Sequence, residues 1–538
     1  MTRFERLTAA LGRAALKIGA SEVPAFKLET PRDPAHGDVA TNLALVLAPL
    51  LRDKPRSVAE RLVAALDLSH GEVKNVEIAG PGFINFFLAE AQLTSVLSDI
   101  LAAGDRFGGS ETGRGVKVNV EFVSANPTGP LHVGHGRGAA LGDGIARLLE
   151  WTGHTVTREF YVNDAGSQIE KLAQSLWARI QGKEPPEGGY HGLYLVELAE
   201  QADPRWHEGS YEDWATELRT YAMSAVRSEQ QEDLAQFRVE FDAWTSEREL
   251  YDSGKVQAAL DLLAQRDLTF EEGGALWLRT SQFGDDKDRV LRKQDGTLTY
   301  LAPDIAYHID KRDRKFDVAI DVWGADHHGY IGRMRAALRA LGCPDSFFNV
   351  VLVQLVKVVR GGEEVKMSKR SGEFVTLRDL YQEVGVDAAR YFFLMRRGDS
   401  QFVFDVDLAK SQTEENPVFY VQMANARMSG IFRVAARTPE SVAIDGVDLT
   451  ALGAPEELDL LKELAAFPGV VARAAETREP HRITAFLDGL ARLAHAWYHK
   501  FRVLGEPEEA ARLVLARAVR QVFANGLALL GIHAPDRM

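Results

Sequence analysis

The sequence predicts an α/β protein in which a parallel sheet with covering helices stands between a small α+β domain and a helical bundle. Residues 116–123 alternate apolar and polar side chains with period two, as a strand does. A turn-rich stretch and a helical pattern follow, and strand, loop and helix in that order are typical of a parallel sheet. From about residue 411 onward, apolar residues recur every three to four positions, which indicates packed helices.

The composition is that of a globular chain. Its 538 residues, of 59.4 kDa, suffice for about three domains that each bury a core. Hydrophobic residues make up 46% of the chain, and no run of eighteen apolar residues could span a bilayer. The single cysteine, Cys343, excludes an internal disulfide and a cysteine-rich zinc site. The first nineteen residues resemble an amphipathic helix more than an export signal, so we expect a cytoplasmic protein.

The net charge of −14 is unevenly distributed. Residues 181–290 hold 11 Lys and Arg against 24 Asp and Glu, so nearly all of the negative excess lies there. The nearly neutral remainder can carry basic patches that follow phosphates, because affinity for a polyanion depends on the local field. The acidic stretch has two interpretations, a solvated helical face or an element that steers a polyanionic partner.

Three domains are expected. Residues 1–108 combine helical patterning with strand-like alternation near residues 73–88, which indicates a small α+β domain. Residues 109–410 add a helix from about His135 to Trp151 and an acidic helical insertion near residues 181–240, and residues 411–538 form the bundle. Further strand candidates of the central domain lie at residues 155–162, 318–324 and 349–356.

The first motif of the central domain is His132-Val133-Gly134-His135, where a strand gives way to a helix. The free amides of a helix N-terminus favour phosphate, and Gly134 lets a nucleotide lie close to the backbone. The imidazoles of His132 and His135 can donate hydrogen bonds to phosphate oxygens.

The second motif is Lys366-Met367-Ser368-Lys369-Arg370, on a loop bounded by glycines that can close over a leaving pyrophosphate. Each motif alone is weak evidence, because paired histidines are often structural and a basic cluster is usually a solvated loop. Their occurrence together in one α/β domain predicts an adenylate-forming reaction with ATP.

Residues 120–135 resemble the signature region of class I aminoacyl-tRNA synthetases, and specifically of arginyl-tRNA synthetases. The Lys366 to Arg370 motif is fully formed, where many members carry a degenerate version. The resemblance touches every domain and is weakest in the acidic insertion. It extends to residues 37–42, 161–168, 416–422 and 529–535.

The resemblance implies a Rossmann-type catalytic domain, an additional tRNA-contacting N-terminal domain and a C-terminal anticodon-binding bundle. The implied enzyme is an ATP-dependent ligase of protein synthesis. The carboxylate of arginine attacks the α-phosphate of ATP, with Mg²⁺ present, and a ribose hydroxyl of the 3′ terminal adenosine of tRNA(Arg) then takes the arginyl group. Bound tRNA is expected to be needed for the first step. A monomer without an editing domain or structural zinc is also expected.

The same resemblance implies a set of site residues. A guanidinium is a planar fork of donors that suits carboxylates. Asp304 and Tyr300 are therefore expected to contact the guanidinium of arginine, with Glu247 as a second acid. Glu121 and Asn126 are placed at the α-amino and carboxylate end, and a lysine substrate would leave acceptors unpaired. The remaining expectations are His132, His135, Lys366 and Lys369 for catalysis, Gly134, Asp326, His327, Met367 and Ser368 on ATP, and His328 on arginine.

How Asp326, His327 and His328 divide between ATP and arginine stays open, and a metal site there is the less favoured interpretation because no further cluster completes four ligands. For tRNA, we expect side chains of one helix of the bundle to stack on unstacked bases and to form hydrogen bonds with them. Its candidate residues are Tyr420, Gln422, Asn425 and Arg427.

Three other functions explain parts of the pattern. A cysteinyl-tRNA synthetase would be expected to hold zinc with cysteines, which one cysteine cannot do. A small-molecule nucleotidylyltransferase would share both ATP motifs without needing an anticodon-type bundle. A non-enzymatic tRNA-binding relative would be expected to have lost His132, His135, Lys366 or Lys369, all of which are present. An enzyme is therefore the favoured interpretation.

Overall fold

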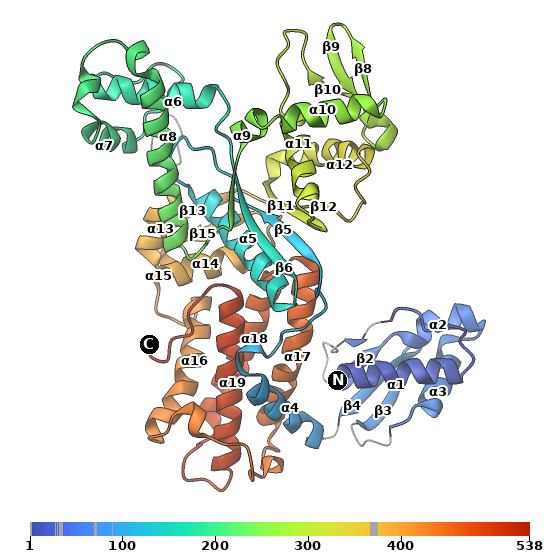
Figure 1. Cartoon of the computed structure of the whole chain (residues 1–538). Coiled ribbons are helices and arrows are strands. Elements are labelled where there is room, and N and C mark those ends of the chain that lie inside the picture. Colours follow the sequence, from blue (N-terminus) through green and yellow to red (C-terminus); the bar gives the residue numbers. More distant parts are fainter. Residues whose placement is uncertain are drawn as a thin grey trace.

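The computed structural model describes residues 3–26, 28–29, 31, 36–68, 73–88, 90–365 and 375–538. A five-stranded sheet lies at the centre of the molecule, two lobes rise above it, and a helical bundle extends below it (Figure 1). The N-terminal domain stands beside the bundle (Figure 1). The predicted fold class, with its α/β catalytic domain, N-terminal domain and helical C-terminal domain, is confirmed.

The N-terminal domain is an antiparallel sheet covered by helices. Its strands lie in the order β1-β2-β4-β3, and Leu43, Leu47, Leu62 and Phe86 form part of its fully buried core. Helix α4 (Glu90–Ala103) leaves this domain and packs on the bundle. The other elements are α1 (Arg3–Lys17), β1 (Leu28–Glu29), β2 (Val39–Thr41), α2 (Leu43–Leu51), α3 (Pro55–Ala65), β3 (Val73–Ala79) and β4 (Phe83–Leu88).

The central sheet is parallel throughout and has the order β12-β11-β5-β6-β7. Its strands are β5 (Lys117–Glu121), β6 (Thr155–Val162), β7 (Ala243–Ser246), β11 (Val318–Gly324) and β12 (Phe348–Val353). The predicted strands at residues 155–162 and 318–324 match β6 and β11 in full. The chain moves from β5 to β6 and β7 on one side and later to β11 and β12 on the other, so the strand order reverses between β5 and β11.

The third predicted strand, at residues 349–356, ends earlier than expected. At Gln354 the chain leaves the central sheet, because the Gln354 carbonyl accepts a hydrogen bond from the buried Arg137 at 3.0 Å. Val356 then begins a second small sheet in the order β14-β13-β15. Its strands are β13 (Val356–Arg360), β14 (Glu363–Glu364) and β15 (Phe402–Asp405).

Helix α5 (Val133–Trp151) connects β5 to β6 and is buried along most of its length. Small residues let it lie close to the sheet: a Cβ atom at Gly142 would come within 2.1 Å of the Phe122 ring, and one at Gly136 within 2.6 Å of Leu377. The close approach fixes the helix, and therefore its N-terminus, against the sheet.

Two insertions form the upper lobes (Figure 1). The first holds α6 (Ser167–Ile180), α7 (Tyr194–Glu200) and α8 (Tyr211–Gln236) around its own small core. The acidic stretch is helical through α8, but residues 269–292 form an antiparallel sheet in the order β10-β9-β8, which the helical pattern did not indicate. The second lobe consists of α9 (Glu247–Asp252), α10 (Lys255–Gln265), β8 (Thr269–Glu272), β9 (Ala275–Leu278), β10 (Arg289–Arg292), α11 (Leu301–Asp313) and α12 (Ile331–Ala340).

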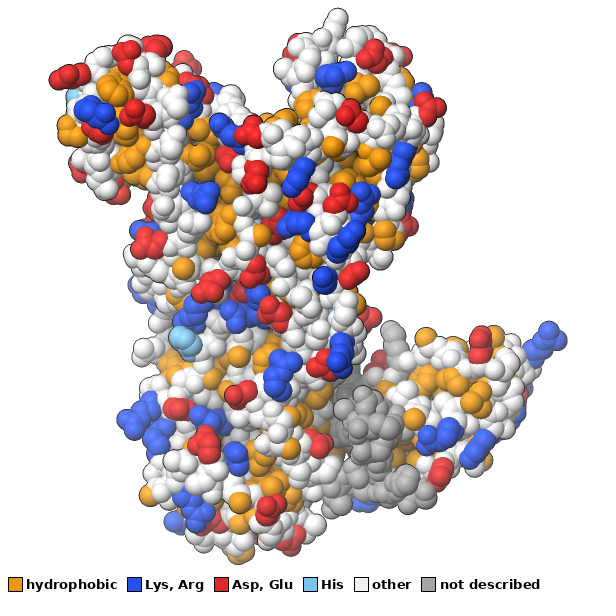
Figure 2. Space-filling view, viewed as in Figure 1, with side chains coloured by type: hydrophobic (Ala, Val, Ile, Leu, Met, Phe, Trp, Pro, Cys, Tyr) orange, Lys and Arg blue, Asp and Glu red, His pale blue; other side chains and the backbone are white. Residues whose placement is uncertain are grey.

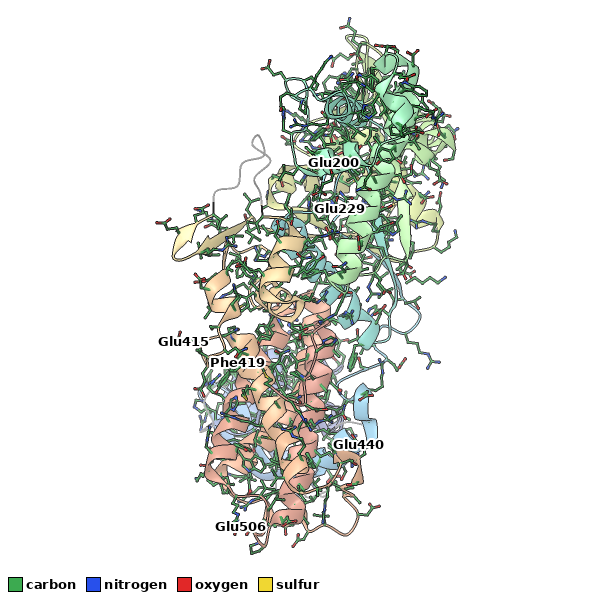
Figure 3. The ribbon with its side chains drawn as sticks, turned by 90° about the vertical axis from the view of Figure 1, so that its left-hand side faces the viewer. Glu200, Glu229, Glu415, Phe419, Glu440 and Glu506 are labelled. Carbon is green, nitrogen blue, oxygen red and sulfur yellow. The ribbon has the colours of Figure 1, made fainter. Side chains whose placement is uncertain are left out.

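The chain from residue 377 to its end is mainly helical, as the apolar periodicity predicted from residue 411. Figure 3 shows Glu200 and Glu229 on the upper lobe and Glu415 and Phe419 where the bundle begins. Within the described residues, no helix is both long enough and apolar enough to cross a membrane. The helices are α13 (Leu377–Val384), α14 (Val386–Leu394), α15 (Val406–Lys410), α16 (Pro417–Val434), α17 (Pro455–Thr477), α18 (His481–Lys500) and α19 (Glu509–Leu529).

One buried arginine, Arg390, joins helices α14 and α5 to the end of the chain. Arg390 of α14 is fully buried, and its guanidinium donates to the carbonyls of Leu530 and Phe237 at 2.9 and 3.0 Å. It also pairs with the buried carboxylate of Asp143 on α5. Gly531 has a φ of 68°, and a Cβ atom there would come within 2.3 Å of the Arg390 guanidinium.

Replacement of Arg390 by methionine is expected to lower the free energy of unfolding by about 3 to 5 kcal/mol, because buried acceptors lose their charged donor. The measurement is the urea midpoint together with the slope of the transition. Arg397→Met is the control, since the Arg397 side chain is 60% exposed and its ion pairs among the described residues are with Asp399 and Glu479. Equal midpoints for the Arg390 variant and the native protein would contradict the role of this contact.

Candidate active site

The reversal of strand order between β5 and β11 marks the place where a parallel sheet of this kind binds ligands, at the carboxyl ends of its strands. Figure 2 shows the molecule hollowed between the two upper lobes, above the central sheet. The segment after β5 is strained: Val123 and Ser124 have positive φ values of 69° and 40°. A positive φ is unusual for a β-branched residue and points to a functional constraint at this strand end.

His132 and His135 cap the N-terminus of α5 with their own side chains. The Nδ1 atom of His132 accepts hydrogen bonds from the amides of Gly134 and His135, at 3.1 and 3.3 Å. The Nδ1 atom of His135 accepts one from the amide of His132 at 3.2 Å, and the two rings stack with centroids 3.6 Å apart. Because both Nδ1 atoms are acceptors, each neutral ring carries its proton on Nε2, the form that can donate to a phosphate oxygen.

The motif residues Lys366, Met367, Ser368 and Lys369 lie outside the described residues. The chain that follows them is described and lies directly against the His132 segment. The amide of Leu377 donates to the Leu131 carbonyl at 2.7 Å, and the amide of Val133 donates to the Val375 carbonyl at 3.4 Å. His132 and Thr376 also form an isolated antiparallel bridge. Residues 375–377, which follow the second motif in the sequence, are therefore held against the first motif by backbone hydrogen bonds.

Across the reversal point, β11 ends in the short helix η5 (Ala325–Tyr330), which carries Asp326, His327 and His328. All three side chains are exposed, and His327 lies 3.7 Å from the Asp326 carboxylate. Among the described residues, no three or more histidine, cysteine or acidic side chains are grouped so that they could hold a metal ion.

Two carboxylates lie on neighbouring helices of the second lobe. Glu247 begins α9, and Asp304 stands in the first turn of α11. Glu247 is 6% exposed, and burial raises its pKa to about 7, which the nearby Tyr161 side chain opposes and which repulsion from Asp304 and Asp164 reinforces. Burial also raises the pKa of Asp304, although it accepts a hydrogen bond from the Tyr330 hydroxyl at 2.6 Å. Neither carboxylate forms an ion pair with any described residue, so the pair is suited to receive a cation from outside.

A second buried cluster lies at the end of β5, where Glu121 is 7% exposed. The Nζ atom of the fully buried Lys311 lies 2.6 Å from Glu121 and 3.0 Å from Asp321. Burial alone lowers the pKa of Lys311, but the charges of Asp321 and Glu121 outweigh it and raise the pKa overall. His308 pairs with the other oxygen of Asp321 at 2.8 Å. Lys311 thus remains a cation held between two carboxylates.

The structure brings some predicted arginine-site residues together and leaves others apart. The charge of Asp304 helps to raise the pKa of Glu247, whereas the Tyr300 side chain is 74% exposed in this conformation. Asn126 is exposed, and its carbonyl accepts a hydrogen bond from Gln230 at 3.1 Å.

Sequence reasoning missed the two tyrosines beside the carboxylates, Tyr161 and Tyr330. Tyr161 has a buried hydroxyl and stacks at a tilt on Tyr307, with centroids 4.6 Å apart. The available signal was position, since Tyr161 closes β6 and Tyr330 ends the segment that follows β11.

The predicted RNA-contacting residues of α16 divide into two pairs. Gln422 and Asn425 are buried, and their amides donate to Asp387 and the carbonyls of His533 and Pro535. They bind the end of the chain to the bundle and are not free to read bases in this conformation. Tyr420 lies beside the ring of His495, and Arg427 contacts His495 at 2.6 Å and His499 at 3.2 Å.

Family models cover nearly the whole chain. The arginyl tRNA synthetase N terminal domain matches residues 5–88, and the catalytic domain of class I (R) tRNA synthetases matches residues 96–195 and 196–414. The DALR anticodon binding domain matches residues 421–538.

The chain is also similar to curated proteins and to solved structures. It is 48% identical to the arginine–tRNA ligase of Shouchella clausii, with 96% of this chain and 95% of that one covered. It is 48% identical to the arginine–tRNA ligase of Geobacillus kaustophilus, with 99% of each covered. The crystal structure of a putative arginyl-tRNA synthetase from Campylobacter jejuni matches at 35% identity and a TM-score of 0.79, over 84% of this chain and all of that one. The arginyl-tRNA synthetase of Thermus thermophilus matches at 25% identity and a TM-score of 0.80, with 99% of this chain and 100% of that one covered.

The raised pKa of Glu247 predicts a pH-dependent loss of stability in the free protein. Between the ordinary pKa of a glutamate and about 7, the folded state binds more protons than the unfolded state, so stability falls as pH rises. Glu247→Gln is therefore expected to be more stable than the native protein at pH 8, by up to about 3 kcal/mol, with the difference vanishing toward pH 4.

Urea unfolding at both pH values measures this difference. Glu249→Gln, on an exposed residue of the same helix, is the control and is expected to follow the native protein at both pH values. A stability gain for Glu247→Gln that is the same at pH 4 and pH 8 would contradict the assignment.

Proposed function

Because the chain belongs to the arginyl-tRNA synthetases of class I, it is an ATP-dependent ligase that charges tRNA with arginine, and we propose which residues carry each step. The observation that carries the proposal is a pair of carboxylates, the buried Glu247 and the half-buried Asp304, neither of which forms an ion pair with any described residue. A guanidinium supplies the missing charge together with a fork of donors.

We propose that the guanidinium of arginine binds between Asp304 and Glu247. The hydroxyl of Tyr330 orients Asp304, at 2.6 Å, so that one carboxylate oxygen remains available to the substrate. Tyr300 and His328 complete this end of the pocket, and the exposed ring of Tyr300 has to turn inward to do so. A lysine substrate is rejected because its compact ammonium leaves acceptors of the pocket unpaired.

The other end of arginine is assigned to the carboxyl end of β5. Glu121 receives the α-ammonium group, and Asn126 contacts the substrate carboxylate. The strained backbone at Val123 and Ser124 supports this assignment, because it sets the direction of the loop between Glu121 and Asn126.

ATP is assigned to the N-terminus of α5. His132 and His135 donate from Nε2 to phosphate oxygens, and Gly134 allows the nucleotide close to the backbone. Asp326 and His327 are assigned to the nucleotide from the far side of the crevice. Lys366, Met367, Ser368 and Lys369 approach it from their loop. Mg²⁺ bound together with ATP would offset the negative charge of the phosphates.

In the first step, an oxygen of the arginine carboxylate attacks the α-phosphorus of ATP, and the bond from that phosphorus to the bridging oxygen of pyrophosphate breaks. Donors from His132, His135 and Lys369 stabilise the charge that accumulates on the phosphate oxygens. In the second step, a ribose hydroxyl of the terminal adenosine of tRNA attacks the carbonyl carbon of the adenylate. AMP leaves, and the hydroxyl proton is lost.

For tRNA, we propose that Tyr420 and Arg427 contact the anticodon loop, through stacking and hydrogen bonds to unstacked bases. Gln422 and Asn425 contribute by binding the end of the chain to α16. We further propose domain boundaries at residues 108 and 410, a monomer, and a cytoplasmic location.

Aminoacylation of total tRNA with each of the twenty amino acids tests the function. Arginine alone should be esterified to tRNA. ATP–pyrophosphate exchange should depend on arginine, and measuring it with and without tRNA tests the expected need for tRNA in the first step. Charging with another amino acid would overturn the assignment of the carboxylate pair.

Asp304→Asn is expected to raise the KM for arginine about a hundredfold, because a buried charge partner of the guanidinium is removed. The KM for ATP should change little. Asp313→Asn is the matched control, since Asp313 lies on the same helix and 63% of its side chain is exposed. Equal rises in both KM values would show that arginine binds elsewhere.

Lys369→Ala is expected to slow adenylate formation about a hundredfold, from the size of a contact made in the transition state. Binding of tRNA, measured by filter retention, should be preserved. Lys357→Ala serves as the control because Lys357 is an exposed lysine on β13 whose one ion pair within the described part of the chain is with Glu364. An unchanged rate of exchange for Lys369→Ala would remove this lysine from the mechanism.

A further inference from the structure

We propose that Lys311 is a positioning residue that holds Glu121 in place for the α-ammonium group of arginine, so that helix α11 fixes both ends of the substrate site. The inference rests on the proposed placement of arginine between Glu121 and the Glu247 and Asp304 pair. It adds a residue that contacts no substrate and acts only through Glu121.

The surroundings of Lys311 are unusual for a lysine. The side chain is fully buried, its Nζ atom contacts Glu121 and Asp321 at 2.6 and 3.0 Å, and it lies 4.3 Å from the centre of the Tyr307 ring. A buried ion pair is costly to form, and apolar residues often replace one without loss of stability. The orientation of the Glu121 carboxylate is a function that an apolar residue could not provide.

Glu121 is held from two sides and retains capacity for a ligand. Its Oε2 atom accepts from Lys311, and its Oε1 atom accepts from the Ser124 hydroxyl at 3.0 Å. The Ser124 hydroxyl in turn accepts from the amide of Tyr161 at 3.1 Å, which ties the loop to β6. A carboxylate accepts up to about four hydrogen bonds, so an ammonium group can still bind.

Lys311 also preserves the charge of Glu121. Burial raises the pKa of Glu121, and the charge of Lys311 opposes this rise. Without the lysine, desolvation and the neighbouring Asp321 favour protonation of Glu121, and a neutral acid binds an ammonium group weakly. Position and ionisation of Glu121 therefore depend on the same residue.

One helix carries the contacts for both ends of the substrate. Asp304, His308 and Lys311 are spaced i, i+4 and i+7 and so share one face of α11. His308 joins them, because its ring contacts the Asp304 carbonyl and the Asp321 carboxylate, both at 2.8 Å. Asp304 and Lys311 are thus about 10 Å apart along the axis of a rigid helix. This separation suits an extended arginine with a carboxylate at each end.

The test measures binding of arginine and of 5-guanidinopentanoate, which is arginine without its α-amino group, to the full-length protein by calorimetry. The native protein should prefer arginine. In Lys311→Met, the Kd for arginine is expected to rise about tenfold or more, with the Kd for 5-guanidinopentanoate nearly unchanged. A general structural defect would instead weaken both ligands equally.

Arg314→Met is the matched control. Arg314 ends the same helix and pairs with Glu159 of β6 at 2.9 Å, so its loss breaks a similar contact that does not involve Glu121. This variant should keep the native preference for arginine. Should it lose that preference as Lys311→Met does, the effect belongs to the helix as a whole and the proposal fails.

Lys311→Met leaves two buried carboxylates without their lysine and is at risk of not folding. The double variant Lys311→Met/Asp321→Asn removes one charge of each sign, keeps the net charge of the cluster, and should lose the preference for the α-amino group in the same way. A double variant that folds and still prefers arginine as strongly as the native protein overturns the proposal.

Glu121→Gln separates this inference from the proposed function. If Glu121→Gln abolishes the preference but the Lys311 variants retain it, Glu121 binds the α-ammonium group without help from Lys311, and only the positioning role is wrong. If Glu121→Gln itself retains the preference, arginine does not bind there, and the placement of the substrate fails with the inference.

Discussion

The reversal of strand order between β5 and β11 is the constraint on which the rest of the site depends. A parallel sheet opens a crevice only where successive connections leave on opposite sides, and here that place lies beside the N-terminus of α5. The His132 segment, the helix after β11 and the two acidic clusters are all placed by that topology. Glu121, the His132 segment, Glu247 and the helix after β11 each follow the end of a strand of this sheet, whereas Asp304 and Lys311 come from α11.

The two upper lobes are insertions after β6 and β7, and they carry most of the residues that are proposed to contact the arginine side chain. Glu247 lies directly at the end of β7, whereas Asp304 and Lys311 come from α11 within the second lobe. In the proposed assignment, the ends of the sheet strands contact the nucleotide and the inserted segments contact the amino acid side chain.

Sequence reasoning identified the fold because the parallel strands are nearly continuous apolar or alternating runs, and β6 and β11 match in full. It placed Glu247 and Asp304 at the guanidinium through resemblance, and this placement stays a prediction. It missed Tyr161, Tyr330 and the Lys311 cluster, since a tyrosine at a strand end and a lysine on a helix carry no local signal of burial. It assigned Gln422 and Asn425 to contacts with RNA. The spacing of polar residues along a helix does not reveal that the end of the chain covers that face of the helix.

The unpaired carboxylates Glu247 and Asp304 have a consequence beyond selectivity. A ligand that binds only the folded state stabilises it by mass action, and the effect is larger when the ligand also relieves repulsion in the free protein. If arginine binds this pair as proposed, it stabilises the folded chain in addition to serving as a substrate, and the chain without arginine is then easier to unfold.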